Sequence, residues 1–328
     1  MVPDSRVSSR PVQVLATGIS GFAGHHLVAE LVGAGHQVHG VFWNDREPVP
    51  EGVVGVYYGD ITDADAIAKA VTAVAPELVF HLAGAASVGQ SFDQPVATWH
   101  VNLDGTLVLL EALRQHAPTA RCVAITSGEV YGRVPVEDLP VGPDTPMVPH
   151  SPYGASKAAA DLAALQYRIG YGLPVLRVRA FNHIGPGQDP RFVVPAVARQ
   201  IALGERDGLE QIQIHVGNID TRRDFTDVRD IVRAYRLVAE RGDPDAVYLA
   251  CTGRSVAVRQ LIDGLAAMAR TETIITSDAT LQRDGEQPDL YGSPDRLTHD
   301  TGWVPQIPLE VSLADTLDWW RARVAQED

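Results

Sequence analysis

Cysteine is scarce in this chain: 328 residues include only Cys122 and Cys251, and they lie far apart. This count excludes a disulfide framework, and we expect both residues to be small buried hydrophobes. A metal site is not expected either. His25 and His26 are adjacent, so their side chains diverge on a helix, and no HxxxH or CxxC spacing accompanies them.

Long hydrophobic runs are also missing. No apolar stretch approaches the roughly 20 residues that a membrane-spanning helix needs. The first residues, MVPDSRVSSRPVQ, lack the apolar segment of a signal peptide, so we expect a cytoplasmic protein. Positive charge is in deficit, since the net charge is −14. That balance argues against nucleic acid or an anionic membrane as the main partner, although a local basic pocket is enough to bind a small anion.

What is present is an alternation of short apolar runs with longer amphipathic stretches. Hydrophobic residues make up 45% of the chain, as in ordinary globular proteins. Strands alternating with helices predict parallel pairing and right-handed crossovers, hence a Rossmann-like doubly wound α/β sheet. The predicted strands span 12–18, 36–43, 53–60, 78–84, 121–127, 174–182 and 246–250, and helices are expected near 96–116, 152–170 and 309–324.

The rhythm breaks after Asn182, where Gly-Pro turns interrupt the alternation. We therefore expect two domains. The first comprises 11–182 and about 219–252, and the second is a smaller discontinuous lobe of about 183–218 and 253–328.

A glycine-rich turn, TGISGFAG, follows the first predicted strand and precedes a helix. Glycines at 18, 21 and 24 allow a tight turn and close approach to a pyrophosphate, while the helix N-terminus supplies N–H donors. This context predicts dinucleotide binding by the first domain. The candidate contacts are Gly18, Ser20, Gly21, Phe22, Ala23 and Gly24.

The end of the second strand usually separates NAD from NADP, because an acid there binds ribose and a cation binds the 2′-phosphate. This chain reads VFWNDRE, in which Asn44 and Arg46 suit a phosphate and Asp45 suits a ribose. The sequence leaves the choice between NAD(H) and NADP(H) open. Asp60 ends the third strand and is a candidate acceptor for the adenine amino group, and the next residue, Ile61, is a second candidate cofactor contact.

The segment SPYGASKA (151–158) has Tyr153 and Lys157 at positions i and i+4, one turn apart on a helix face. Pro152 suits the first helical position and Ser151 suits the cap. A cation beside a phenol lowers the phenol's pKa. The alternative is a surface helix that carries a tyrosine and a lysine by chance.

With the glycine turn, TSGEVYG (126–132) and SPYGASKA in this order, the chain resembles the extended short-chain dehydrogenases/reductases from Val12 to about Trp320. The resemblance implies that Tyr153 acts as acid or base and that Lys157 lowers its pKa and binds the nicotinamide ribose. It also implies that Ser127 holds the substrate oxygen. Further implied cofactor contacts are Leu82, Ala83 and Gly84 of HLAG and Asn102 of VNLDGT.

The second half resembles GDP-4-keto-6-deoxy-mannose reductases and, less closely, GDP-mannose 4,6-dehydratases, in FNHIGPGQ, VGNIDTRRDFTDVRDIVRAY and GSPDRLTHDTGWVPQIPLEVSL. The resemblance implies that Arg223 and Arg283 grip the diphosphate of a nucleotide sugar, as paired guanidinium groups can. The alternative for each is an exposed salt-bridge arginine. The other implied substrate contacts are Ser87, Asn182, Val193 and Glu286.

Two positions depart from those relatives. Arg283 is followed by Asp284 where proline is usual, and Trp43 stands where the reductases tend to have arginine, so their NADP preference does not transfer. Apart from its first arginine, RDFTDVRD (223–230) alternates in charge and is predicted to be a solvated helix start.

The residues after Ser127 help to distinguish a reductase from a dehydratase. Dehydratases typically read Thr-Asp-Glu or Thr-Ser-Glu here, whereas this chain reads Ser127-Gly128-Glu129. Gly128 has no side chain that could donate a proton. Glu129 is either a catalytic base or an acid with only a structural role in a cap or loop. This pattern favours reduction of the C4 keto group of an NDP-4-keto-6-deoxyhexose, such as GDP-4-keto-6-deoxy-D-mannose, giving the rhamnose or the talose product. A 4,6-dehydratase, a 4-epimerase and a non-catalytic nucleotide-binding regulator stay open.

The resemblance also implies a homodimer, formed through a four-helix bundle of the segments 152–170 and 96–116. Leu162, Leu165 and Ile169 recur at helical spacing on the first of these segments. The same spacing suits an internal core.

Overall fold

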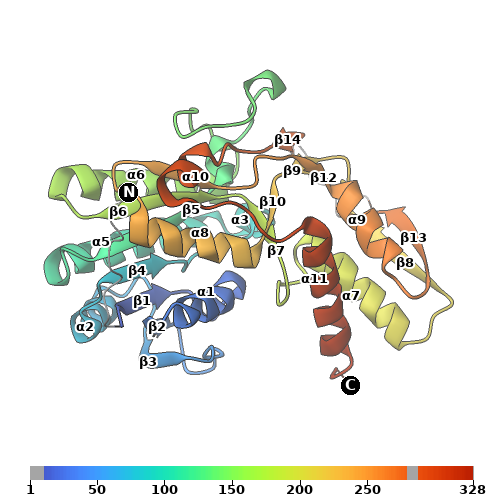
Figure 1. Cartoon of the computed structure of the whole chain (residues 1–328), viewed down its shortest axis with the longest axis horizontal. Coiled ribbons are helices and arrows are strands. Elements are labelled where there is room, and N and C mark those ends of the chain that lie inside the picture. Colours follow the sequence, from blue (N-terminus) through green and yellow to red (C-terminus); the bar gives the residue numbers. More distant parts are fainter. Residues whose placement is uncertain (1–10, 279–286, 328) are drawn as a thin grey trace, which may run out of the picture. The chain divides into compact units, whose positions relative to one another are not determined.

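The computed structural model describes residues 11–278 and 287–327, and its main feature is a seven-stranded sheet (Figure 1). The strand order is β11-β6-β5-β4-β1-β2-β3. The strands are β1 Gln13–Thr17, β2 Gln37–Phe42, β3 Val53–Tyr58, β4 Leu78–His81, β5 Arg121–Ser127, β6 Val175–Ala180 and β11 Val247–Ala250. Each lies within a predicted strand, so the predicted fold class is confirmed.

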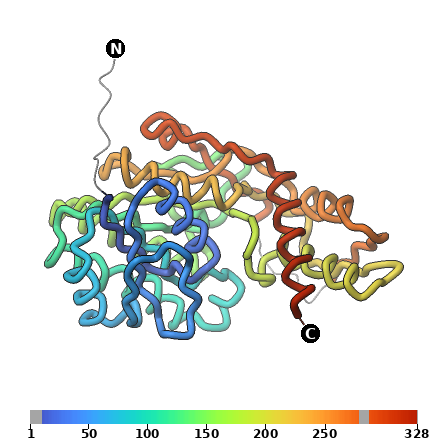
Figure 2. The backbone as a smooth tube through the Cα atoms, turned by 60° about the horizontal axis from the view of Figure 1, so that its bottom comes forward, coloured from blue at the N-terminus to red at the C-terminus, as the bar shows by residue number. Residues whose placement is uncertain are grey.

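The sheet begins in its middle. The chain runs outward from β1 through β2 to β3, then crosses back to β4 on the other side of β1, as the labels of Figure 1 show; Figure 2 traces the same backbone as a tube from blue to red. The pairs β1–β2, β2–β3, β1–β4 and β4–β5 are all parallel. The reversal between β1 and β4 is the switch point at which doubly wound sheets bind ligands, beyond the carboxyl ends of the strands.

Buried apolar side chains of α2, α5 and α6 share one core with the sheet, including Ile67, Leu109, Leu113, Ala164 and Val175. The helices of this half are α1 Phe22–Gly33, α2 Ala64–Val74, α3 Val88–Asp93, α4 Pro95–Trp99, α5 Gly105–His116, α6 Pro152–Tyr171 and α8 Val228–Arg241. The single helix predicted over 96–116 is interrupted: residues His100–Asp104 form a π-helical turn between α4 and α5.

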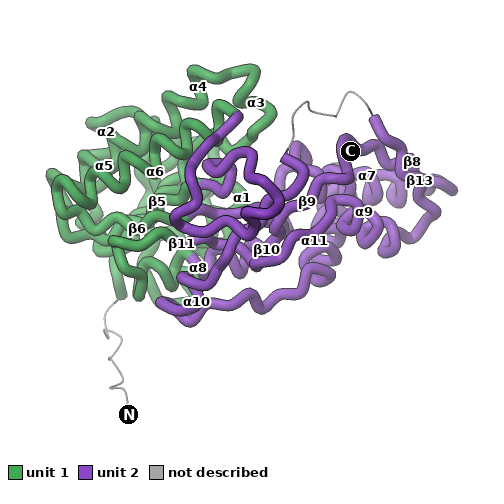
Figure 3. The backbone as a smooth tube through the Cα atoms, turned by 90° about the horizontal axis from the view of Figure 1, so that it is seen from above, with its two compact units in different colours: residues 1–126, 151–178, 235–247 green, residues 127–150, 179–234, 248–328 purple. Residues whose placement is uncertain are grey.

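The chain divides into two compact units, coloured separately in Figure 3. Unit 1 comprises 1–126, 151–178 and 235–247, and unit 2 comprises 127–150, 179–234 and 248–328. Unit 2 has a core of its own, in which α7, α9 and α11 pack around β8. Its further elements are β7 Asn182–Ile184, α7 Val193–Arg206, β8 Gln211–Val216, β9 Arg222–Arg223, β10 Phe225–Asp227, β12 Val256–Ala257, α9 Val258–Ala267, β13 Glu272–Ser277, β14 Asp289–Leu290, α10 Asp295–Thr301 and α11 Leu309–Val324, with 3₁₀ turns at Gly128–Tyr131 and Val136–Asp138.

The prediction that RDFTDVRD starts a solvated helix is half right. Its last residues, 228–230, begin α8, but the residues before them lie in and between the short strands β9 and β10, and Asp224, Asp227 and Asp230 are buried rather than solvated. Each carboxylate is hydrogen-bonded: Asp224 to the backbone N–H groups of 252–254, Asp227 to the Ser312 hydroxyl and Asp230 to the N–H groups of 306 and 307. A buried carboxylate needs hydrogen-bond donors, and here the donors come from loops of unit 2 and from α11. The acids of this segment therefore hold those parts of unit 2 in place.

The prediction for the cysteines is confirmed, since both are free and fully buried. Burial raises the pKa of the Cys122 thiol to about 12. Among the described residues, no helix is both long enough and apolar enough to cross a membrane.

Candidate functional site

The glycine turn of unit 1 has no room for side chains where it bends. Gly18 has a φ of +71°, and a Cβ there would lie 2.6 Å from the backbone nitrogen of Ala83. A Cβ on Gly24 would lie 2.3 Å from Cα of Ile19. Both positions therefore require glycine.

The N-cap residue of α1 is Gly21, which has no side chain with which to cap the helix, and the first turn contains no acid. Helix N-termini of this kind bind anions through their N–H groups and the positive end of the helix dipole. Phe22 and Ala23 are the first helical residues, and the Phe22 ring packs edge-on against His26. The turn thus fits the pyrophosphate of a dinucleotide.

At the end of β2 the structure adds a residue that the sequence interpretation passed over. Both carboxylate oxygens of Glu47 are hydrogen-bonded: one accepts from the Ser20 hydroxyl at 3.0 Å and the other from the Trp43 N–H at 2.7 Å. Asn44, a predicted contact, accepts instead from the backbone N–H of Arg46 at 2.9 Å. A turn at 44–47 therefore brings a downstream acid back to the end of the strand.

Asp60 follows β3 and is held as an acceptor. Its carboxylate accepts from the N–H and the hydroxyl of Thr62 at 2.9 and 2.7 Å. These hydrogen bonds hold its pKa below the usual value. The neighbouring Ile61 side chain packs in the core beside Gly105, where a Cβ would come within 2.8 Å of it.

A chain of buried hydrogen bonds runs from β1 to the π-helical turn. His81, at the end of β4, lies between the hydroxyls of Thr17 and Thr106 at 2.9 and 3.0 Å. The Thr106 hydroxyl donates its hydrogen bond to the Asn102 carbonyl, so toward His81 it can only accept. The proton of the neutral imidazole is therefore on Nε2, which donates to Thr106, and Nδ1 accepts from the Thr17 hydroxyl. Burial, and then the charge of Lys157, lower the pKa of His81 to about 3, so the imidazole is neutral.

Asn102 connects this network to α6. Its amide donates to the Ser156 hydroxyl at 2.8 Å, and its oxygen accepts from the Ala85 N–H at 2.8 Å. Ser156 in turn donates to the Tyr153 carbonyl at 2.8 Å. The HLAG loop packs tightly here, since a Cβ on Gly84 would lie 2.7 Å from Oδ1 of Asn102 and 3.1 Å from Nζ of Lys157. Leu82 and Ala83 are fixed by N–H donation to Thr17.

Tyr153 and Lys157 lie in the first two turns of α6, as predicted. Ser151 caps this helix by accepting from the Gly154 N–H at 3.0 Å, and Pro152 is its first residue. The Lys157 ammonium donates to the Ile125 carbonyl at 3.2 Å, and its burial lowers its pKa to about 8. Tyr153 is half-buried.

Unit 2 begins with Ser127, the last residue of β5. The Ser127 hydroxyl accepts from the Glu129 N–H at 3.2 Å. Gly128 packs against a ring: a Cβ there would lie 3.0 Å from Phe181, tighter than ordinary van der Waals contact. Glu129 is half-buried in the 3₁₀ turn that follows.

The predicted substrate contacts lie on several elements. Asn182 is exposed on β7, Val193 is the first residue of α7, and Ser87 caps α3 through the Gln90 N–H at 3.2 Å. Arg223 is half-buried on β9 and donates to the Gln287 and Arg222 carbonyls at 2.7 and 2.8 Å. Arg283 and Glu286 lie outside the described residues.

This geometry can be set beside known proteins. The family described as GDP-mannose 4,6 dehydratase matches residues 15–316. The chain belongs to this family of extended short-chain dehydrogenases/reductases. The resemblance drawn from the sequence is thus confirmed.

Two similar proteins carry names of different activities, one a reductase and the other a dehydratase. The chain is 39% identical over 315 residues to "GDP-6-deoxy-D-mannose reductase" of Pseudomonas aeruginosa, covering 96% of this chain and 99% of that protein. It is 30% identical to "GDP-mannose 4,6 dehydratase 2" of Arabidopsis thaliana, covering 94% and 86%.

Solved structures agree on the fold. The structure of RMD from Pseudomonas aeruginosa complexed with NADPH has a TM-score of 0.83 at 38% identity, covering 95% of this chain and 99% of that one. The UDP-glucose 4-epimerase of Thermus thermophilus in complex with NAD has a TM-score of 0.82 at 30% identity, covering 94% and 98%. These two neighbours bind different forms of the nicotinamide cofactor.

Proposed function

We propose that this protein reduces the C4 keto group of a nucleotide-linked 4-keto-6-deoxyhexose with a reduced nicotinamide cofactor, GDP-4-keto-6-deoxy-D-mannose being the preferred substrate. The likeness to a GDP-6-deoxy-D-mannose reductase over nearly the full length supports this choice. In this proposal the sheet domain holds the dinucleotide and the smaller lobe, with Asn182, Val193 and Arg223, holds the nucleotide sugar.

The glycine turn and the network behind it fit a dinucleotide. Gly18, Gly21 and Gly24 would hold the pyrophosphate, Asp60 the adenine, and Asn102 and Lys157 the nicotinamide side. When bound, the reduced cofactor supplies the hydride. Tyr153 gives its proton to the oxygen on C4, with the Ser127 hydroxyl as a second donor to that oxygen, so negative charge is neutralised where it develops. Lys157 favours the phenolate form and so lowers the cost of proton loss from Tyr153.

The observation that carries reduction over dehydration is the packing of Gly128 against Phe181. A dehydratase needs an acid besides the tyrosine to expel the C6 hydroxyl. At Gly128 a side chain would have to displace the ring, and the glycine itself has no proton to give. Glu129 is therefore assigned to a sugar hydroxyl rather than to elimination.

The test is to incubate the purified chain with GDP-4-keto-6-deoxy-D-mannose and NADH or NADPH and to follow absorbance of the reduced nicotinamide. We expect oxidation of the cofactor and a 6-deoxyhexose product whose C4 configuration, rhamnose or talose, is read by NMR. Conversion of GDP-mannose to a keto sugar without net cofactor oxidation would contradict the proposal and make the chain a dehydratase. Binding of nucleotide without any turnover would make it a regulator.

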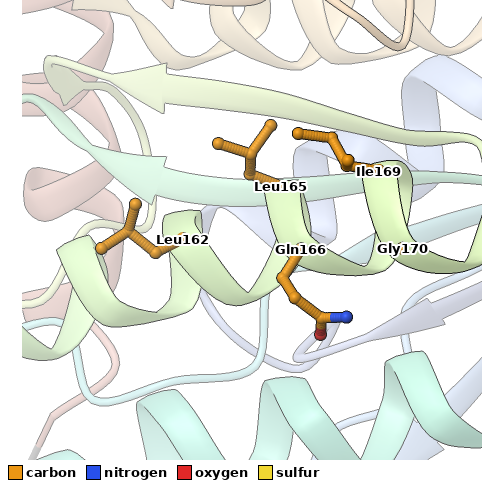
Figure 4. Close-up of a pocket in the computed structure, with 5 residues that line it drawn as sticks. All are labelled: Leu162, Leu165, Gln166, Ile169 and Gly170. Atoms are coloured by element: carbon orange, nitrogen blue, oxygen red, sulfur yellow. The ribbon is translucent and has the colours of Figure 1, made fainter.

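The proposal includes a homodimer, formed by α6 and the helices beside it. Five residues line a shallow hollow along α6: Leu162, Leu165, Gln166, Ile169 and Gly170 (Figure 4). Leu162 and Ile169 are 52% and 74% exposed. The neighbouring α3 and α4 add exposed Phe92, Val96 and Trp99. Exposed apolar side chains on three helices that contact one another suit the surface of a second copy of the same chain.

A further inference from the structure

The carboxylate of Glu47 lies where a doubly wound domain reads the adenosine ribose. That place is the carboxyl end of the second strand, next to the glycine turn. Here the residue that directly follows β2 is Trp43, whose side chain is 68% exposed and carries no charge. Glu47 is four residues further on, and it is fixed by one donor from each side: the Ser20 hydroxyl in the glycine turn and the Trp43 N–H at the strand end.

We infer that Glu47 is the residue that makes this chain select NADH over NADPH, an inference that rests on the proposed cofactor site. A carboxylate has about four acceptor positions, and two are used by Ser20 and Trp43. The remaining two can accept from the 2′- and 3′-hydroxyls of a ribose. A 2′-phosphate offers no such donors and brings about two negative charges against the carboxylate.

The same contacts remove the donors that a phosphate needs. The Ser20 hydroxyl and the Trp43 N–H already donate to Glu47, so a 2′-phosphate gains them only by displacing the carboxylate. The Asn44 side chain presents its oxygen to the Arg46 N–H within the same turn. Arg46 is the residue of this loop that could instead favour NADPH, because its guanidinium is exposed and is the positive charge nearest to Glu47 in the sequence.

The experiment measures cofactor binding by titration calorimetry on the full chain without any sugar. We expect NADH to bind at least about tenfold more tightly than NADPH, the discrimination that like-charge contact commonly gives. Glu47→Gln keeps the shape of the side chain, removes its charge, and should reduce this ratio to about threefold or less by strengthening NADPH binding. The fragments AMP and 2′,5′-ADP should show the same pattern, and added salt should weaken it in the unsubstituted chain.

Two neighbouring substitutions complete the experiment. Glu51→Gln makes the same change at an exposed residue that has no proposed role and should leave the ratio unchanged. Arg46→Gln tests the competing cation: the variant should still bind NADH more tightly than NADPH, whereas a selective loss of NADPH binding in it would assign the site to phosphate and overturn the inference.

Three further outcomes would overturn it: tighter binding of NADPH by the unsubstituted chain, an equal effect of Glu51→Gln and Glu47→Gln, or weakening of the binding of both cofactors alike by Glu47→Gln. These results leave the proposed reductase standing, with a different cofactor preference. Absence of binding by either cofactor would overturn the proposed function as well.

Discussion

The side-chain amide of Asn102 donates to the hydroxyl of Ser156 across 2.8 Å, which ties the π-helical turn at 100–104 to the first turns of α6. The Ser156 hydroxyl donates a hydrogen bond to the Tyr153 carbonyl. The helix segment that carries Tyr153 and Lys157 is therefore connected through Ser156 to Asn102. Wide π-helical turns inside α-helices often mark functional positions. Here the turn places a buried amide between the HLAG loop and the helix segment that carries the proposed proton-transfer pair.

The first prediction concerns this amide. Asn102→Ala leaves the Ala85 N–H without its acceptor and Ser156 without its donor. Loss of partners for buried polar groups should lower the free energy of unfolding by about 1–3 kcal/mol, measured by urea denaturation. Asn218→Ala removes an amide from an exposed loop and should change it by less than about 0.5 kcal/mol. Equal effects of the two substitutions would show that Asn102 does not position α6.

Tyr153→Phe removes the proposed acid and keeps the ring. Turnover should fall by about 10²- to 10⁴-fold, the usual contribution of a positioned proton donor, while the dissociation constant of the cofactor stays the same. Tyr171→Phe makes the same change at the exposed end of the same helix and should retain activity. Full activity of Tyr153→Phe in the reductase assay would eliminate the proposed mechanism.

Lys157 should make stability depend on pH. Its pKa of about 8 in the folded chain lies below the ordinary 10.5. Between these values the unfolded chain binds more protons, so the free energy of unfolding rises with pH by up to about 1.4 kcal/mol per unit. Lys157→Met should abolish this rise in the free energy of unfolding between pH 8 and 9.5, whereas Lys69→Met, at an exposed position of α2, should retain it.

The titration of Lys157 can also be observed directly, because the chain contains only two lysines, Lys69 and Lys157. With ¹³C-labelled lysine, the Cε resonance that disappears in Lys157→Met should titrate near pH 8. A midpoint above 10 for that resonance would show that burial does not lower the pKa of this ammonium.

The exposed apolar face of α6 gives a prediction about assembly. Ile169→Asp places a charge in the proposed dimer interface and should shift the chain to monomers, because burying an unpaired carboxylate is costly. Sedimentation equilibrium at micromolar protein should show half the mass of the unsubstituted chain. Val54→Asp, at a similarly exposed site on the edge strand β3, is the matched control. An unsubstituted chain that sediments as a monomer would remove the dimer from the proposal.

The sequence by itself determined what depends on neighbours along the chain. All seven strands of the sheet lie within predicted segments, because short apolar runs bounded by turns suffice to mark the strands of a parallel sheet, even at its exposed edge, β3. The Ser151 cap, Pro152 and the i, i+4 spacing of Tyr153 and Lys157 were predictable for the same reason. So was the glycine turn, whose backbone angle and close contacts admit no side chain at Gly18.

The tertiary structure decided what depends on residues distant in sequence. Glu47 escaped the sequence interpretation because a turn, not its sequence position, returns its carboxylate to Ser20. RDFTDVRD was predicted to be solvated because its charges alternate, but its acids meet donors some 30 to 85 residues away. The pKa of Lys157 is likewise lowered by burial, and its ammonium lies beside Ile125 of β5 and Gly84 of the HLAG loop, which are distant in sequence. Hydrogen-bond partners and solvent exclusion are properties of the folded chain, and no local pattern encodes them.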